Sequence, residues 1–179
     1  MTLFATATST PGTYGTWADA ATYFASRLHE LAWSAASLAD QNSSLLAATR
    51  IIDALNFKGC KSAVHTLLLT APESTVAEIQ AAEASQLLEF PRDADTVVPR
   101  PITEATYEIA YALLDGKDPD LELENLVVNS MTYGNVKTVY ERTQLPLEHI
   151  VNGVPSATAW RMLKPFLREA TAVKLSRVS

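Results

Sequence analysis

The chain has 179 residues, of which 47% are hydrophobic and 19% are charged, and its formal net charge is −6. This length suits one domain or two small ones, and the composition excludes a disordered or low-complexity chain. A domain of this length buries about 70% of its unfolded surface, so we expect it to fold without disulfides or a structural metal. The single cysteine, Cys60, agrees with that expectation.

Membrane insertion and secretion are also disfavoured by the sequence. No apolar stretch approaches the length of about 20 residues that a membrane-spanning helix needs. Residues 1–10 contain neither a basic segment nor a sustained apolar run, as a signal peptide would. We therefore expect no membrane partner and a cytoplasmic setting.

The charges are distributed unevenly along the chain. Residues 73–124 have a local net charge of −10, whereas residues 161–179 have one of +4. Proteins that bind nucleic acids usually present a basic face, because neutralising phosphates supplies much of the affinity. Here only the C-terminal segment could do so, and the plain alternative is a solvated acidic face with a frayed basic tail.

The first part of the chain predicts two helices. Thr16 is placed to cap a helix whose apolar residues recur at helical spacing over residues 17–31. A second helix starts at Ser37 and keeps one apolar face through Asn56, and Gly59 provides a stop signal.

The middle of the chain is harder to interpret. Residues 64–69 fit either a strand or a turn of helix, and a new helix is expected from about residue 70 to Ser85. Its apolar face is thin, so we expect it at the surface or against another subunit, through Val76, Ile79 and Ala82. After a polar loop, another helix follows Pro101 and ends near Gly116.

The remaining pattern predicts a polar turn at residues 115–120, a β-hairpin near residues 126–141 and a last helix at 156–166. The expected fold class is therefore mainly α, a bundle of about four to five helices with a β-hairpin insertion and extended termini. The expected organisation is an N-terminal arm (1–15), a helical domain (16–168) and a basic C-terminal tail (169–179).

A search for chemistry along the chain finds no catalytic motif, metal site or cofactor site. The three histidines are far apart and share no ligand spacing, and Cys60 has no neighbouring catalytic pattern. The acidic run at residues 115–124 lacks the glycine position of an EF-hand loop, so a polar turn explains it better than calcium binding. The tryptophans sit at helical spacing without interleaved cations, which favours packing over base stacking.

Several short motifs together carry a resemblance. In chain order they are residues 16–24 (TWADAATYF), 32–33 (AW), 45–53, 57–59 (FKG), 88–92 (LEFPR), 98–99 (VP), 102–110 with 114–116 (LDG), 133–137 (YGNVK) and 155–167. The order of these motifs resembles that of the head-to-tail adaptor (head completion or connector) proteins of tailed bacteriophages. That group often carries the label of putative DnaT-like single-stranded-DNA-binding proteins.

The resemblance implies a structural virion protein at the head–tail junction, assembled in the host cytoplasm. Its partners would be the portal protein, a tail or nozzle protein and further copies of itself in a dodecameric ring. Double-stranded DNA would pass through the channel at ejection without specific binding. By position, the resemblance assigns portal contacts to the C-terminal residues Trp160, Phe166, Leu167, Arg168, Lys174 and Arg177.

Within such a ring, two further surfaces acquire a predicted role. The thin apolar face of Val76, Ile79 and Ala82 would form ring contacts. An acidic lumen would keep DNA moving, and we expect it to be lined by Asp118, Asp120, Glu122 and Glu124. Two alternatives remain open: a single-stranded-DNA-binding replication accessory protein, and a small enzyme with an unrecognised site.

Overall fold

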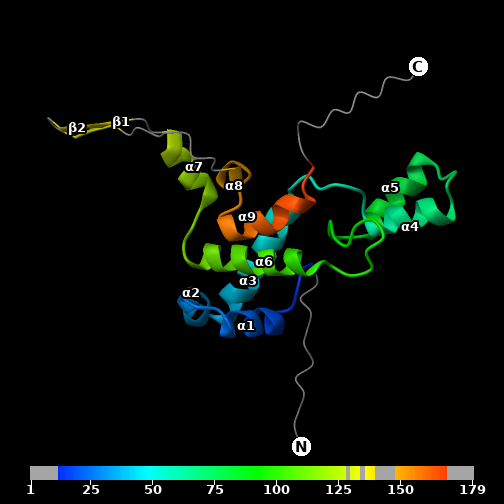
Figure 1. Cartoon of the computed structure of the whole chain (residues 1–179), viewed down its shortest axis with the longest axis horizontal. Helices are drawn as coiled ribbons and strands as arrows, with labels where there is room; N and C mark the ends of the chain where they lie inside the picture. Colours follow the sequence, from blue (N-terminus) through cyan, green and yellow to red (C-terminus); the bar gives the residue numbers. More distant parts are fainter. Residues whose placement is uncertain (1–11, 128–129, 134–135, 140–147, 169–179) are drawn as a thin grey trace, which may run out of the picture.

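The structure, a computed structural model, describes residues 12–127, 130–133, 136–139 and 148–168 (Figure 1). Within these ranges the chain is mainly helical, as expected, but it contains nine α-helices rather than four to five. None of the helices in the described ranges is long and apolar enough to cross a membrane.

The elements have the following bounds. The helices are α1 (Trp17–Ala25), α2 (Leu31–Ala35), α3 (Leu38–Asp53), α4 (Ser62–Thr70), α5 (Val76–Ser85), α6 (Arg100–Leu114), α7 (Pro119–Val127), α8 (Glu148–Val151), α9 (Ala157–Leu163) and the 3-10 helix η1 (Lys164–Phe166). The strands are β1 (Ser130–Tyr133) and β2 (Val136–Val139).

The core forms around α6, which packs against α3 on one side and α9 on the other, while α1 and α2 lie below them in Figure 1. The apolar positions predicted for α6 are buried at helical spacing, among them Ile102 and Ile109. Beside them, Phe24 of α1 stacks on Trp33 of α2 with ring centroids 4.5 Å apart. Helices α3, α6 and α9, which are distant in sequence, thus share one apolar core with α1 and α2.

The predicted helix starts are confirmed where a capping side chain was recognised. The hydroxyl of Thr16 accepts a hydrogen bond from the backbone N–H of Asp19 (3.1 Å). The hydroxyl of Ser37 accepts one from the N–H of Asp40 (3.2 Å). Each cap satisfies a backbone donor that the first turn of the helix leaves without a partner.

The apolar stripe predicted for residues 17–31 is interrupted, because α1 already ends at Ala25. Leu28 and Leu31 are 83% and 75% exposed, so they are not part of the core. Between α1 and α2 the chain turns, and His29 has a positive φ of 59°. Leu38 is also exposed, whereas Leu45, Ala48 and Ile52 of the second predicted stripe are buried as expected.

The turn is fixed by an ion pair between Arg27, which follows α1, and Glu108 of α6. The carboxylate of Glu108, whose side chain is 5% exposed, accepts hydrogen bonds from the Arg27 guanidinium (2.9 Å) and from the Tyr23 hydroxyl (2.7 Å). Burial and the adjacent carboxylate raise the pKa of Tyr23, so the phenol stays protonated and acts as the donor of this hydrogen bond. The Arg27 guanidinium also lies over the ring of Tyr111, 4.2 Å from its centroid.

The expectation for residues 115–141 requires correction. Asp118 accepts a hydrogen bond from the N–H of Asp120 (3.0 Å), and the chain continues as α7 to Val127 where the hairpin was expected to begin. The two strands pair antiparallel but have only four residues each. The connection at 134–135 and the flanks at 128–129 and 140–147 lie outside the described residues, so a hairpin insertion is not confirmed.

Residues 64–69, left open between strand and helix, belong to helix α4, and the helix expected from about residue 70 to Ser85 is α5. Thr75 and Glu78 make a capping box, which places the start of α5 at Val76 and not near residue 70. The two helices pack against each other and stand apart from the body of the molecule, at the right of Figure 1. This segment is therefore a projecting helical pair.

We predict that removing the buried carboxylate of Glu108 destabilises the protein more than removing the half-buried carboxylate of Glu104, whose partner is exposed. Glu108→Ala leaves the Arg27 guanidinium without its partner and should lower the free energy of unfolding by about 3 kcal/mol. Glu104→Ala, the matched control, breaks a pair with the 87% exposed side chain of Arg100 and should cost at most about 1 kcal/mol. Urea denaturation measures both, and equal losses would contradict the role assigned to Glu108.

Candidate interaction site at the C-terminal junction

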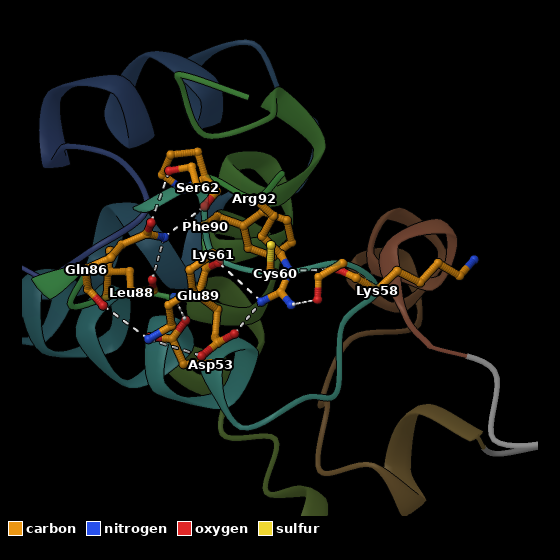
Figure 2. A network of polar contacts seen from close by, with 12 residues as sticks. Asp53, Lys58, Cys60, Lys61, Ser62, Gln86, Leu88, Glu89, Phe90 and Arg92 are labelled. Atoms are coloured by element: carbon orange, nitrogen blue, oxygen red, sulfur yellow. Dashed lines mark hydrogen bonds and ion pairs between the residues drawn. The ribbon is translucent and has the colours of Figure 1, made fainter. Parts of the chain in front are cut away.

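Three segments that are distant in sequence meet where the described chain ends (Figure 2). They are residues 56–62, residues 86–93 and residues 164–168, and we call their meeting point the C-terminal junction. The first two contain the FKG and LEFPR motifs.

The C-terminal segment is fixed by backbone pairing with the segment after α3. The N–H of Lys58 donates to the carbonyl of Phe166, and the N–H of Arg168 donates to the carbonyl of Asn56, both at 2.9 Å. The pairing is antiparallel and involves a single bridge rather than a strand. It therefore sets the position from which residues 169–179 continue.

Three phenylalanines, one from each segment, fill the space beneath this pairing. Phe90 is 3% exposed, and its ring meets that of Phe57 edge-on with centroids 4.7 Å apart. Phe166 also packs against Phe90, with ring centroids 5.8 Å apart and the two rings nearly perpendicular. Edge-to-face contacts of this kind add about 0.5–1.5 kcal/mol beyond the burial of apolar area.

Arg92 connects the LEFPR motif to the FKG motif. Its Nε donates to the carbonyl of Lys58 and its Nη2 to the carbonyl of Gly59, each at 2.8 Å. A third nitrogen pairs with the carboxylate of Glu89. The Arg92 side chain is only 11% exposed, so this guanidinium stabilises the junction and is not a free cation for a ligand.

Gln86 and Lys61 complete the network on the side of α4. The Gln86 amide nitrogen donates to the carbonyls of Leu88 (2.9 Å) and Pro91 (2.8 Å), and its oxygen accepts from the Ser62 hydroxyl (3.1 Å). The Lys61 ammonium donates to the Gln86 carbonyl (3.1 Å). One amide side chain thus attaches the start of the projecting helical pair to the junction.

A close approach of two turns explains why a glycine stands at position 59. Gly59 has a φ of +73°, and a Cβ there would lie 2.1 Å from a carboxylate oxygen of Asp93. That carboxylate accepts a hydrogen bond from the N–H of Cys60 (2.9 Å). Any other residue at this position would therefore meet both backbone strain and a clash.

The junction also includes Tyr14, from the segment expected to be an arm. Tyr14 is 1% exposed, and its hydroxyl donates a hydrogen bond to the carboxylate of Asp53 and accepts one from the N–H of Phe90 (3.2 Å). Asp53 also accepts from the N–H of Glu89 (3.3 Å). Burial raises the pKa of Asp53 and of Tyr14 above their ordinary values.

The solvent side of the junction is mixed in charge. Lys58, Lys164 and Arg168 are exposed in the segments of the junction, and Arg161 is exposed on α9, which precedes the last of these segments. Lys164 pairs with the exposed carboxylate of Glu148 at 2.8 Å. A hollow of about 320 Å³ lies between the segments and is lined by Lys58, Asp93, Asp95 and Phe166, together with other residues.

Among the predicted portal residues that the structure describes, some are packed against the protein and one is exposed. Phe166 and Leu167 are half-buried and pack against the protein's own core, and Trp160 donates to Glu148 (3.3 Å). Arg168 is exposed, and its side chain is available at the surface. Lys174 and Arg177 lie outside the described residues.

The other predicted site residues lie on two separate parts of the molecule. Val76 is 71% exposed at the start of α5, and Ile79 and Ala82 are half-buried on the same helix. The acidic set lies on or before α7 and is exposed apart from the half-buried Glu122; its members are Asp118, Asp120, Glu122 and Glu124. The structure therefore does not bring the three predicted sites together.

No metal-binding cluster of three or more His, Cys, Asp or Glu side chains occurs among the described residues. Cys60 is half-buried, and burial followed by the nearby carboxylate of Asp93 raises the pKa of its thiol. A raised pKa is the opposite of what a nucleophilic cysteine needs.

One protein family matches this chain over almost its full length. Its description is "Putative DnaT-like ssDNA binding protein", and the match spans residues 5–178. The chain belongs to this family. The family is described by single-stranded-DNA binding and is not an enzyme class. No curated protein and no solved structure matches the chain.

We predict that Arg92 is required for the junction to stay closed. Arg92→Ala removes two charge-assisted bonds to backbone carbonyls and an ion pair of a side chain that is only 11% exposed, and should lower the free energy of unfolding by about 2–4 kcal/mol. Arg92→Lys should recover only part of this stability, because an ammonium group cannot reproduce the planar set of donors of a guanidinium. Chymotrypsin should also cleave faster after Phe166 in Arg92→Ala.

The control for this prediction is Arg50→Ala, which removes an exposed arginine of α3 and should change stability by no more than about 0.5 kcal/mol. If Arg92→Ala were as stable and as resistant to chymotrypsin as Arg50→Ala, the guanidinium would not hold the segments together.

We further predict a pH dependence that originates from Asp53. Because its pKa in the folded protein is raised above the ordinary 3.8, its protonated form favours folding. That contribution is present below pH 3.8 and is lost as pH rises through the raised pKa. The Asp53→Asn variant does not titrate at this position and so does not lose this contribution. Its free energy of unfolding, relative to that of the unmutated protein, should therefore increase as pH rises from about 4 to 7.

Urea denaturation of both proteins across this range measures the difference, in which the other titrating groups cancel. A difference that stays constant with pH, or that decreases as pH rises, would contradict the assignment.

Proposed function

We propose that this chain is a non-enzymatic assembly subunit, a head-to-tail adaptor that forms a ring between the portal and the tail of a tailed bacteriophage. The single observation that carries the proposal is the C-terminal junction. The FKG, LEFPR and C-terminal motifs support the resemblance, and the segments that contain them meet at this junction. Their contacts fix the position of Arg168, after which the basic C-terminal segment of the chain follows.

The charge at this end supports a docking role for the C-terminal segment. Arg161 is exposed on α9 and Arg168 at the junction, and Lys174 and Arg177 follow in the C-terminal segment. Complementary charge increases the rate of encounter and selects the partner and its register. On this proposal, an acidic surface of the portal is the partner of this basic end.

The projecting helical pair supports contacts between copies. Neighbours in a ring touch through two different patches, so each copy needs one surface that fits a different surface of the next. Helix α5 buries none of its residues in the described chain and presents Val76 to solvent. We propose that α4 and α5 provide one side of that contact.

The acidic surface of α7 fits the proposed channel. Asp118, Asp120 and Glu124 are exposed, and no basic side chain lies in the last turn of this helix. Carboxylates on a channel wall repel phosphates, so DNA would pass without being held.

A second candidate function is single-stranded-DNA binding, and the family description favours it over the adaptor. The basic end would then bind phosphates instead of an acidic protein surface. Binding of this kind combines a positively charged groove with exposed aromatic rings. At the junction, Lys58 and Phe166 line one hollow, but Asp93 and Asp95 share it.

One experiment separates the two candidates. The chain is mixed with its cognate portal and studied by electron microscopy and native mass measurement, and it is titrated in parallel with a labelled oligo-dT by fluorescence anisotropy. An adaptor gives a stacked ring on the portal and little binding to oligo-dT. A single-stranded-DNA-binding protein gives no ring, and its affinity for oligo-dT falls steeply with salt.

Charge reversal identifies the surface responsible in either case. The double variant Arg161→Glu, Arg168→Glu should reduce portal association at least about ten-fold, since it replaces attraction by repulsion. The control Arg50→Glu changes the charge of an exposed residue on α3 and should leave association unchanged. Absence of a portal ring with the natural chain would refute the adaptor proposal.

A further inference from the structure

Helix α6 contains the same short pattern twice, one helical turn apart. Residues 104–107 read EATY and residues 108–111 read EIAY, so a glutamate is followed three residues later by a tyrosine in each copy. Residues three and four apart lie on the same face of a helix, so both glutamates and both tyrosines share one side of α6. We call these copies the first and the second Glu–Tyr pair.

The second pair, Glu108 and Tyr111, holds a cation that belongs to the chain itself. The Arg27 guanidinium donates to the carboxylate of Glu108 (2.9 Å) and lies 4.2 Å from the ring centroid of Tyr111. Tyr23 of α1 donates to the same carboxylate (2.7 Å). A carboxylate and two tyrosines thus form a guanidinium site, and Arg27 occupies it.

The first pair, Glu104 and Tyr107, lines a hollow of about 370 Å³ between α1 and α6, which we call the α1–α6 hollow. Asp19, one turn before Tyr23 on α1, lines it too. The one basic residue that lines the hollow among the described residues is Arg100. It donates to Glu104 (2.7 Å), but its side chain is 87% exposed and thus lies mostly in solvent. The first pair therefore has no buried cation like the one that the second pair holds.

The hydroxyl of Tyr107 lacks a partner in this structure. Tyr107 is 3% exposed, and its hydroxyl is buried without a hydrogen bond among the described residues. Buried polar atoms nearly always have a partner, and an unpaired one costs free energy. Burial, followed by the carboxylates of Asp19 and Glu104, raises the pKa of Tyr107 to about 12, so the phenol stays protonated. Its oxygen is therefore free to accept an N–H group.

The charges of the hollow select a cation as the missing group. Asp19 accepts a hydrogen bond from the Thr16 hydroxyl (2.7 Å) and takes part in no ion pair among the described residues. With Glu104 it gives the hollow two carboxylates against one exposed guanidinium, so an anion would be repelled. Small-molecule pockets have volumes of about 300–1,000 Å³. The hollow is therefore large enough for an alkylammonium or a guanidinium group.

We propose that the α1–α6 hollow binds an organic cation through an ammonium or guanidinium group, held by the carboxylates of Asp19 and Glu104 and by the hydroxyl of Tyr107. The arrangement around Arg27 shows that the same residue types hold such a group one turn further along α6. Because the hydroxyl is buried in the unbound state, side chains that line the hollow must shift on binding. The site does not depend on the proposed ring.

Isothermal titration calorimetry of the full chain tests this site. The probes are putrescine, a free diamine, and Nα-acetylarginine methylamide, which represents an arginine side chain of a partner protein. Neutral butanediol, with the chain length of putrescine, is the matched control. At least one of the two cations should bind with a Kd of about 1 mM or lower, and the diol should not bind. Whichever cation binds more tightly identifies the source of the group, a free amine or a protein side chain.

Two variants identify the residues responsible. Glu104→Gln should weaken binding at least about ten-fold, because it removes the negative charge and keeps the shape. The matched control, Glu73→Gln, neutralises an exposed carboxylate in the turn between α4 and α5 and should change affinity by no more than about two-fold. Tyr107→Phe should weaken binding yet leave the melting temperature of the free protein unchanged or higher, because the hydroxyl that it removes has no partner.

Three binding results would overturn the proposal: no saturable binding of either cation, equal binding of butanediol, or an unchanged affinity in Glu104→Gln. A clear fall in the melting temperature of Tyr107→Phe would overturn it too, because the hydroxyl would then have a partner within the protein. The test uses the free chain and small probes, so failure of the adaptor proposal would leave its result unaffected.

Discussion

The fold depends on the attachment of one irregular segment, residues 86–93, to the helices around it. A loop that enters a protein interior brings backbone donors and acceptors that must find partners. Here the amide of Gln86 donates to the carbonyls of Leu88 and Pro91 within the loop. The guanidinium of Arg92 donates to carbonyls of the segment after α3, and the ring of Phe90 supplies apolar contact. Because the same residues fix the segment after α3 and the last described residues, this single attachment determines where the chain emerges toward residue 169.

The regular elements could be predicted where a capping residue and a one-sided apolar pattern coincide. This holds for α3, which Ser37 caps at its start, and for α6, which ends just before Gly116 with its positive φ of 79°; the apolar positions of both face the core as their spacing indicates. The pattern fails at Leu28 and Leu31, because spacing cannot show that α1 stops at Ala25 and that the chain then turns toward Glu108. It also fails at residues 119–127, where valine, leucine and acidic residues suit either a helix or the edge of a strand.

The candidate site was only partly visible in the sequence. The FKG and LEFPR motifs stand out as short signatures, but nothing in their spacing indicates that Arg92 bonds the carbonyls of Lys58 and Gly59. Phe166 and Leu167 look like surface anchors because they precede a basic tail, yet they are packed inward. Contacts between residues more than thirty positions apart arise from tertiary packing, which local patterns do not encode.

The burial of Tyr14 has a practical consequence for how the protein is produced. A boundary drawn at the first helical residue places this tyrosine in a dispensable leader, whereas its ring meets Phe90 edge-on and its backbone N–H donates to the Thr49 hydroxyl. Recombinant versions trimmed to begin at α1 would lack a core side chain and expose the end of α3. Purification tags and fusion partners therefore belong upstream of this residue, separated from it by the native sequence.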